Sequence, residues 1–135
     1  MTNQVNRRLI ELFAKDHTTA CLSDDVIFHD HAQDRVFKGR DEVENLLQAI
    51  WAEGFPGAVT DVCNIVTDES AAVLEFVLHG RQSGPFMGIP ATGRKVVLPM
   101  VIIFYLHDGR IRSANLYYDA GKLLRQLGLA LDTNT

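Results

Sequence analysis

Hydrophobic positions along this chain change their spacing once, from a helical period to a strand period. Early on, apolar residues recur every three or four positions, which is typical of amphipathic helices. This spacing predicts a helix over 4–15, a short strand at 26–28, a turn from Gln33 to Gly39, and a helix from Gly39 that Gly54-Phe55-Pro56-Gly57 ends. From Ala58 onward, alternation of period two predicts strands over 59–67, 71–79, 95–107 and 110–118.

The predicted strands indicate how the sheet is built. Residues 95–107 are apolar at nearly every position, so we expect a central strand buried on both faces. Asp108-Gly109 predicts a tight hairpin after it. A last helix is expected over 119–127, with Gly128 as its C-terminal cap. Helix, strand, helix, a run of antiparallel strands and a closing helix make an α+β fold, with helices on one face of a curved sheet. Such a sheet encloses a cone-shaped cavity suited to small ligands.

Composition narrows the possible functions. The chain has 135 residues, which fits one domain over 1–135. Its net charge is −4, so we expect no nucleic-acid partner and no anionic membrane surface. Apolar runs stay below the roughly 20 residues of a membrane span, and no signal-peptide pattern opens the chain, so we expect a cytoplasmic protein. Cys21 and Cys63 lack metal or redox spacing; we expect reduced packing residues, with a disulfide as the alternative.

One segment is more specific than the periodicity. Gly84 to Val96 reads Gly-Pro-Phe-Met-Gly-Ile-Pro-Ala-Thr-Gly-Arg-Lys-Val, three glycines and two prolines between apolar runs. Around it, Phe28-His29-Asp30, Phe55-Pro56 and Leu124-Arg125-Gln126-Leu127-Gly128 occur in order. Over most of its length the chain thereby resembles the SnoaL-like polyketide cyclase family.

The resemblance implies a nuclear-transport-factor-2-like, cystatin-like α+β barrel or cone. It also implies a homodimer, a hydrophobic small-molecule ligand and catalysis without metal or cofactor. In the characterised cyclases of this family, an aspartate at the position of Asp119 acts as general acid and base in an intramolecular aldol condensation. One departure stands out: Gln82 occupies a position where the family often has histidine, and glutamine does not titrate near neutral pH.

Asp119 can also be read from its own surroundings. On the strand before it, Ile111, Asn115, Tyr117 and Asp119 alternate onto one face. An aspartate that faces an apolar cavity is suited to take and return a proton near neutral pH. The alternative is that Asp119 simply caps the last helix, as aspartates commonly do.

Four polar residues are candidates for substrate binding. His29 is a candidate hydrogen-bonding group in the pocket, or else a core histidine. Gln82, Asn115 and Tyr117 could orient a carbonyl or enolate oxygen, or simply be polar residues of the sheet surface. His29 and His31 have the spacing of a metal pair, but the further ligands are missing from the expected places, so no metal site is expected.

These residues support a leading hypothesis and two alternatives. The leading one is a cofactor-free enzyme that removes a proton from a hydrophobic carbonyl compound, leading to aldol ring closure or isomerisation. The first alternative is a non-catalytic binding or dimerisation module of the same fold. The second is a related enzyme of the same fold. An epoxide hydrolase would need an Asp-Arg-Asp set in the pocket, of which Arg112 and Asp61 are possible members. A ketosteroid isomerase would need a second acid or a tyrosine beside the oxyanion.

Overall fold

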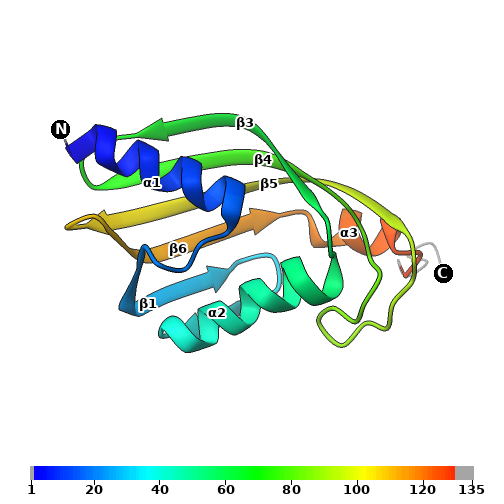
Figure 1. Cartoon of the computed structure of the whole chain (residues 1–135). Coiled ribbons are helices and arrows are strands. Elements are labelled where there is room, and N and C mark those ends of the chain that lie inside the picture. The colour runs from blue at the N-terminus through cyan, green and yellow to red at the C-terminus, as the bar shows by residue number, and fades with distance from the viewer. Residues whose placement is uncertain (1, 130–135) are drawn as a thin grey trace.

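The computed structural model describes residues 2–129 of the chain. A twisted sheet runs through it, and two long helical segments lie against one side (Figure 1). The elements in order are α1 Thr2–Asp16, β1 Leu22–Asp30, β2 Arg35–Lys38, α2 Arg40–Gln48, the π-helical turn η1 Ala49–Gly54, β3 Val59–Thr67, β4 Ala71–Arg81, β5 Lys95–His107, β6 Arg110–Tyr118 and α3 Ala120–Gln126.

The six strands form one open, mixed sheet in the order β2-β1-β6-β5-β4-β3. Neighbouring strands are antiparallel, apart from β1 and β6, which run parallel. The α+β class is therefore confirmed, whereas the expectation of a purely antiparallel sheet is wrong at this one pair. β1 pairs with β2, which follows it, on one side, and the parallel pair arises on its other side, where it meets β6, far along the chain.

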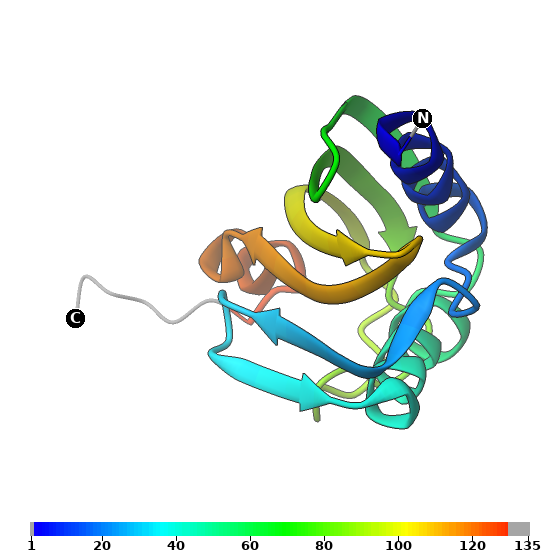
Figure 2. The ribbon, with the colours of Figure 1, turned by 90° about the vertical axis from the view of Figure 1, so that its left-hand side faces the viewer.

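The two long helices cover the same face of the sheet. α1 packs on β3 and β4, α2 packs on β1 and β2, and the sheet curves around them (Figure 2). The buried side of α1 includes Asn6, whose Nδ2 donates to the carbonyls of Asp68 and Glu69 at 3.0 and 3.1 Å. These bonds fix the helix to the β3–β4 turn.

Two segments differ from the expected elements. The predicted turn from Gln33 to Gly39 contains a strand, β2, which pairs with β1 at the edge of the sheet. Four residues are too few to display a strand period in the sequence. The second helix ends in η1, and such π-helical turns are rare and frequent at functional sites.

β5 lies centrally, as expected, but only one of its faces is buried. Leu98 and Phe104 are almost fully buried, while Val97 and Tyr105 remain 46% and 50% exposed. The expectation of burial on both faces is wrong for this chain because both long helices pack on the same side. We call the uncovered side the outer face. Val73 pairs there with Ile103, and Val101 with Tyr117. The apolar members of this face include Ile27, Val73, Val77, Val97, Val101, Ile103, Tyr105 and Tyr117.

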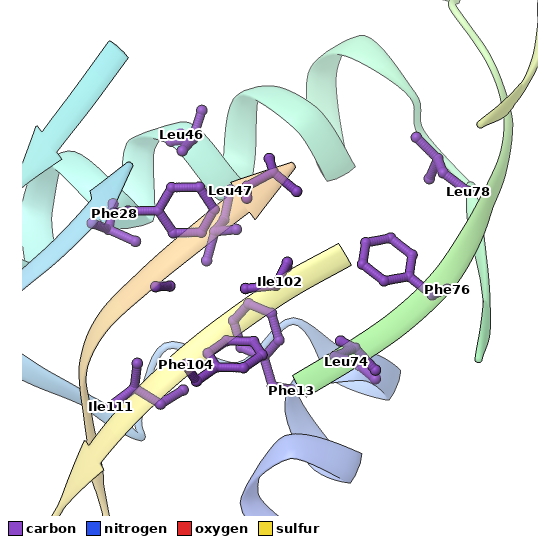
Figure 3. Packing of buried hydrophobic residues seen from close by; sticks show 14 of the residues in the cluster. Phe13, Phe28, Leu46, Leu47, Leu74, Phe76, Leu78, Ile102, Phe104 and Ile111 are labelled. Carbon is purple, nitrogen blue, oxygen red and sulfur yellow. The ribbon is translucent and has the colours of Figure 1, made fainter. Parts of the chain in front are cut away.

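The core fills the space between the helices and the inner face. Side chains from α1, α2 and the middle strands point toward one another there (Figure 3). Phe13 of α1 meets Phe104 of β5 edge to face, with ring centroids 5.3 Å apart. Such aromatic pairs carry much of the energy of a core because they bury large apolar areas.

α3 joins the sheet through a side chain. Because β6 ends at Tyr118, opposite Met100, the part of β5 before Met100 has no partner on β6. The amide of Gln126 takes that place. Its Nε2 donates to Val97 O and its Oε1 accepts from Val97 N, both at 2.8 Å. α3 is thereby held over the wide end of the sheet, near the cavity described below.

The two cysteines are both free. Cys21 is buried, as expected of a packing residue, and burial raises the pKa of its thiol. Cys63 is exposed, so the expectation that it packs is wrong. Within residues 2–129, no helix has the length and apolar character to cross a membrane.

Candidate functional site

A cavity lies between the helices and the inner face of the sheet. Its volume is about 60 Å³, room for a few water molecules. Most of its lining is hydrocarbon and comes from α1, α2, η1 and the strands. The lining residues are Phe13, Ala14, His17, Phe28, Asp30, Leu46, Leu47, Ile50, Trp51, Phe55, Thr60, Leu74, Phe76, Leu78, Phe86, Met87, Leu98, Met100, Ile102, Leu116, Tyr118 and Leu123.

A carboxylate and a phenol form the first polar group of the cavity. Asp30 ends β1, Tyr118 ends β6, and the two strands are neighbours in the sheet. Tyr118 Oη donates to Asp30 Oδ2 at 2.9 Å. Gln33 donates to Asp30 twice, from its backbone N at 3.1 Å and from Nε2 at 3.2 Å, and Nε2 also contacts Tyr118 Oη. Asp30 is only 5% exposed.

This environment fixes the protonation state of Tyr118. Burial raises the pKa of its phenol well above the ordinary value, and the hydrogen bond from Gln33 opposes this only in part; the charge of Asp30 and the hydrogen bond to it add smaller increases of the pKa. The phenol therefore stays protonated at neutral pH and keeps a hydrogen to donate. A carboxylate has about four acceptor sites. Three are used here, so Asp30 retains one that a ligand can approach.

An imidazole and a hydroxyl form the second polar group. His17 follows α1, and its Nε2 lies 3.3 Å from Thr60 Oγ1 on β3. The imidazole stacks on the indole of Trp51 from η1, with centroids 3.6 Å apart and planes within 11°. Burial lowers the pKa of His17, and the adjacent Asp16 only partly opposes this. The ring is therefore neutral at pH 7.

The glycine- and proline-rich segment forms one wall of the cavity. Phe86 and Ile89 exchange backbone hydrogen bonds of 3.0 and 2.9 Å around a turn in which Met87 and Gly88 both have positive φ. That pattern is a tight hairpin turn. It places Phe86 and Met87 against the cavity, and Phe86 packs edge to face on Phe55.

Gln82 anchors this wall and does not line the cavity. Its side chain is fully buried; Nε2 donates to Ile89 O at 3.1 Å, and Oε1 accepts from Thr92 N and Thr92 Oγ1 at 3.2 and 2.7 Å. Its backbone N donates to Arg94 O, and its backbone O accepts from Gly93 N. These bonds occupy the amide within the loop; a role in substrate binding stays a prediction.

Gly84 joins the same wall to η1. Its backbone N and that of Ser83 both donate to Gly54 O. A Cβ at position 84 would lie 2.1 Å from the carbonyl oxygen of Glu53, closer than any real contact. Glycine is therefore required where the loop meets the end of α2 and η1.

Asp119 is exposed and lies outside the lining of the cavity. Its Oδ1 accepts from Lys122 N at 3.0 Å, so the side chain is the N-cap of α3. This is the capping alternative that the sequence left open. The catalytic role that the family resemblance gives Asp119 is not tested by this contact and stays a prediction.

The structure brings His29, Asn115 and Tyr117 together, on the outer face. The ring of His31 stacks between His29 and Tyr117, at centroid distances of 3.6 and 4.4 Å, and its Nε2 lies 2.8 Å from Asn115 Oδ1. His29 Nε2 also lies 3.4 Å from Asp34 Oδ1. These side chains do not line the cavity, because their strands point Phe28, Asp30, Leu116 and Tyr118 inward.

Sequence reasoning missed Asp30, Tyr118, Gln33 and His17. A signal for Asp30 was present: it continues the face of Val26 and Phe28, which is otherwise apolar. It was harder to predict which side chains of β6 point toward the cavity. A register shift lies between Tyr105 and Leu106 opposite this strand, so Ile111 and Leu116 are both buried although their parity differs. Alternation counted from Ile111 therefore selects the wrong face.

Two further alternatives, a metal site and an Asp-Arg-Asp set, can be compared with the positions of the described residues. Among residues 2–129, no group of three or more His, Cys, Asp or Glu side chains is placed to hold a metal ion. Arg112 and Asp61 are both exposed, and the cavity lining described above includes one aspartate and no arginine. The Asp-Arg-Asp set of the epoxide hydrolase alternative is thus not assembled there.

A curved α+β sheet with two long helices on one face is the nuclear-transport-factor-2-like fold. The sequence gives the family within that fold. The family model described as SnoaL-like polyketide cyclase matches residues 3–127, so the chain belongs to this family. No protein among curated sequences matches it.

Solved structures agree on the fold. A candidate SnoaL-like polyketide cyclase from Jannaschia sp. CCS1 superposes with a TM-score of 0.81 at 24% identity, covering 96% of this chain and 94% of that one. A candidate polyketide cyclase from Xanthomonas campestris pv. campestris gives 0.75 at 24% identity, over 94% and 99% of the chains. A protein with a ketosteroid-isomerase-like fold from Catenulispora acidiphila DSM 44928, solved with trimethylamine, gives 0.72 at 17% identity, over 96% and 95%.

Proposed function

We propose that this protein is a cofactor-free enzyme that removes a proton beside the carbonyl group of a hydrophobic small molecule, leading to aldol ring closure or isomerisation. One observation carries the proposal: a buried carboxylate, Asp30, is hydrogen-bonded to a protonated phenol, Tyr118, in a cavity that is otherwise largely apolar. A base and a hydrogen-bond donor side by side are what enolate chemistry requires.

The two side chains divide the reaction between them. Asp30 takes the proton from the carbon next to the carbonyl, and the electron pair of the broken C–H bond moves to the carbonyl oxygen. The Tyr118 hydroxyl turns from Asp30 and donates to that developing oxyanion, while Gln33 continues to donate to Asp30. In the ring-closing reaction the enolate carbon then attacks a second carbonyl of the same molecule, and protonated Asp30 returns its proton to the new alkoxide.

Isomerisation needs the same residues and is the second candidate. Here Asp30 returns the proton to a different carbon of the conjugated enolate, and no C–C bond forms. Tyr118 favours this reading, because a proton donor beside the oxyanion is the feature that an isomerase requires. The family assignment supports ring closure, so the two outcomes are separated by the product formed.

The size of the cavity limits how a ligand enters. About 60 Å³ holds far less than a bicyclic ketone, so binding requires part of the lining to move. The tight turn at Phe86 and Met87 belongs to a loop, whereas most of the other lining residues belong to helices and strands, His17 and Phe55 being the exceptions. Displacement of this turn is the smallest change that enlarges the cavity.

Proton exchange tests the proposal without the natural substrate. In D₂O with β-tetralone, the protein is expected to incorporate deuterium next to the carbonyl faster than buffer or unfolded protein does, as measured by mass spectrometry. Trp51, the sole tryptophan, lines the cavity and reports binding through its fluorescence. Ketones that quench Trp51 at saturation but exchange no faster than in buffer would refute the proposal.

We further propose a homodimer formed by the outer face. Support comes from its composition: β1, β6, β5 and β4 each place apolar side chains on this face, and several are 40–50% exposed, among them Ile27, Val97, Tyr105 and Tyr117. Exposed apolar side chains gathered on one face favour an interaction site, and twofold pairing lets one such face cover itself.

A charge in the middle of the outer face is expected to make the protein monomeric. Val101 lies between Glu75 and Tyr117 on neighbouring strands, so Val101→Glu places like charges together at the interface. Leu12→Glu is the control, since Leu12 is 45% exposed on α1, away from this face. Light scattering after size exclusion should give a dimer for the wild type and for Leu12→Glu. A wild-type monomer would refute the proposal.

A further inference from the structure

The second polar group of the cavity has no part in the chemistry proposed above. Proton removal needs only Asp30, Tyr118 and Gln33. His17 and Thr60 also border the cavity, and within residues 2–129 the imidazole has Thr60 Oγ1 as its only hydrogen-bond partner. One ring nitrogen is therefore left for another partner.

The position of His17 is costly for the backbone. Its φ is +52°, in the left-handed region, at the end of α1 where its N donates to Phe13 O at 2.8 Å. Glycine or asparagine is preferred at such a helix end.

The imidazole is also held rigidly. It stacks on Trp51 with planes within 11° and contacts Thr60 on its edge. Trp51 in turn belongs to η1, the irregular end of the second helix. Three separate segments thus fix one neutral ring at the wall of an apolar cavity. Preorganised polar groups of this kind bind ligand groups with the least loss of entropy.

The two polar groups lie on different parts of the sheet. Tyr118 is on β6 and Thr60 is on β3, with β5 and β4 between them. Neighbouring strands are 4.7–4.9 Å apart, so the separation is roughly 14 Å along the sheet and less across its concave face. A ligand that touches both groups is therefore elongated, with hydrocarbon between two oxygen-bearing ends.

We propose that His17 and Thr60 bind a second oxygen of the substrate, a hydroxyl or carbonyl group remote from the reacting carbonyl at Asp30 and Tyr118. This inference rests on the proposed function for the identity of the reacting end. Because the imidazole and the hydroxyl are neutral and each offers both a donor and an acceptor, they suit an uncharged oxygen and not a carboxylate. The substrate class is an elongated hydroxy- or oxo-ketone with an apolar middle.

Matched probes and matched variants test this site. The probes are β-tetralone and its analogue with a hydroxyl on the aromatic ring. Thr60→Val keeps the shape of the side chain without its hydroxyl, and His17→Phe keeps the stack on Trp51 without the ring nitrogens. Each variant is expected to bind the hydroxylated probe three- to tenfold more weakly, the effect of one lost hydrogen bond, and the plain ketone within twofold of wild type.

Deuterium exchange at saturating probe separates this inference from the proposed function. Both variants should keep the wild-type exchange rate, since neither residue touches the reacting carbon. Equal losses of affinity for the two probes, or no loss for either, would overturn the His17–Thr60 site while leaving the exchange chemistry standing. If the variants lose affinity for the hydroxylated probe alone, but the wild-type protein exchanges protons no faster than buffer, the proposed chemistry would be refuted and the site kept.

Discussion

The Asp30→Asn variant is expected to lose the acceleration of proton exchange by a factor of about 10² to 10⁴, the usual contribution of a positioned general base. Asparagine has nearly the shape of aspartate and can still accept from Tyr118, but it cannot take a proton. Its amide NH₂ then lies at the position of Oδ1 and meets the backbone N–H of Gln33, a second donor, so we also expect a loss of stability of about 1–3 kcal/mol. Exchange of β-tetralone protons and urea unfolding measure the two effects.

Asp119→Asn gives the decisive comparison. Asparagine is as good an N-cap as aspartate, so α3 should be unaffected and any loss of rate would be chemical. If Asp30 is the base, Asp119→Asn keeps the wild-type exchange rate. The reverse result, with exchange lost in Asp119→Asn and kept in Asp30→Asn, would assign the reaction to the residue that the family resemblance indicates. Both variants losing the rate would mean that the two carboxylates cooperate.

Phe104→Ala is expected to cost about 3–5 kcal/mol of stability, the usual range for removing a buried phenylalanine ring. Phe104 is 0% exposed and packs edge to face on Phe13, so its loss leaves a hole between α1 and β5. Whole domains of this size are stable by about 5–15 kcal/mol, so the variant should be marginally folded at best.

Urea unfolding checks this second prediction. The midpoint should fall strongly for Phe104→Ala with little change in slope. Leu12→Ala is the control, because Leu12 is 45% exposed on the solvent side of α1 and its truncation should change stability by less than about 0.5 kcal/mol. Similar midpoints for the two variants would contradict the packing described for α1 against the sheet.

The strands were the part of the fold that sequence patterns predicted best. β3, β5 and β6 have the predicted bounds, because turn residues mark their ends. Asp108 and Gly109, both with positive φ, form the expected hairpin between β5 and β6. β2 and η1 could not be predicted in this way. The first is a four-residue edge strand, and the second depends on contacts with the glycine-rich loop.

The site was predicted less well than the fold, for a physical reason. β5 is apolar on both sides, so its sequence does not tell which side the helices cover. β1 carries candidate polar residues on both faces, with Asp30 on one and His29 on the other. Only the packing of α1 and α2 decides between them. His17 had no local signal at all, since its neighbours Trp51 and Thr60 are distant in sequence.

The Gln126 amide has a consequence for the protein at high concentration. β5 begins five residues before its pairing with β6 does, and that stretch would otherwise present an open edge to which a strand of another molecule could add. Exposed edges of this kind are where sheets aggregate. By occupying both backbone groups of Val97, one glutamine side chain shields that position. α3 thus hinders a strand of another molecule from pairing with this part of β5.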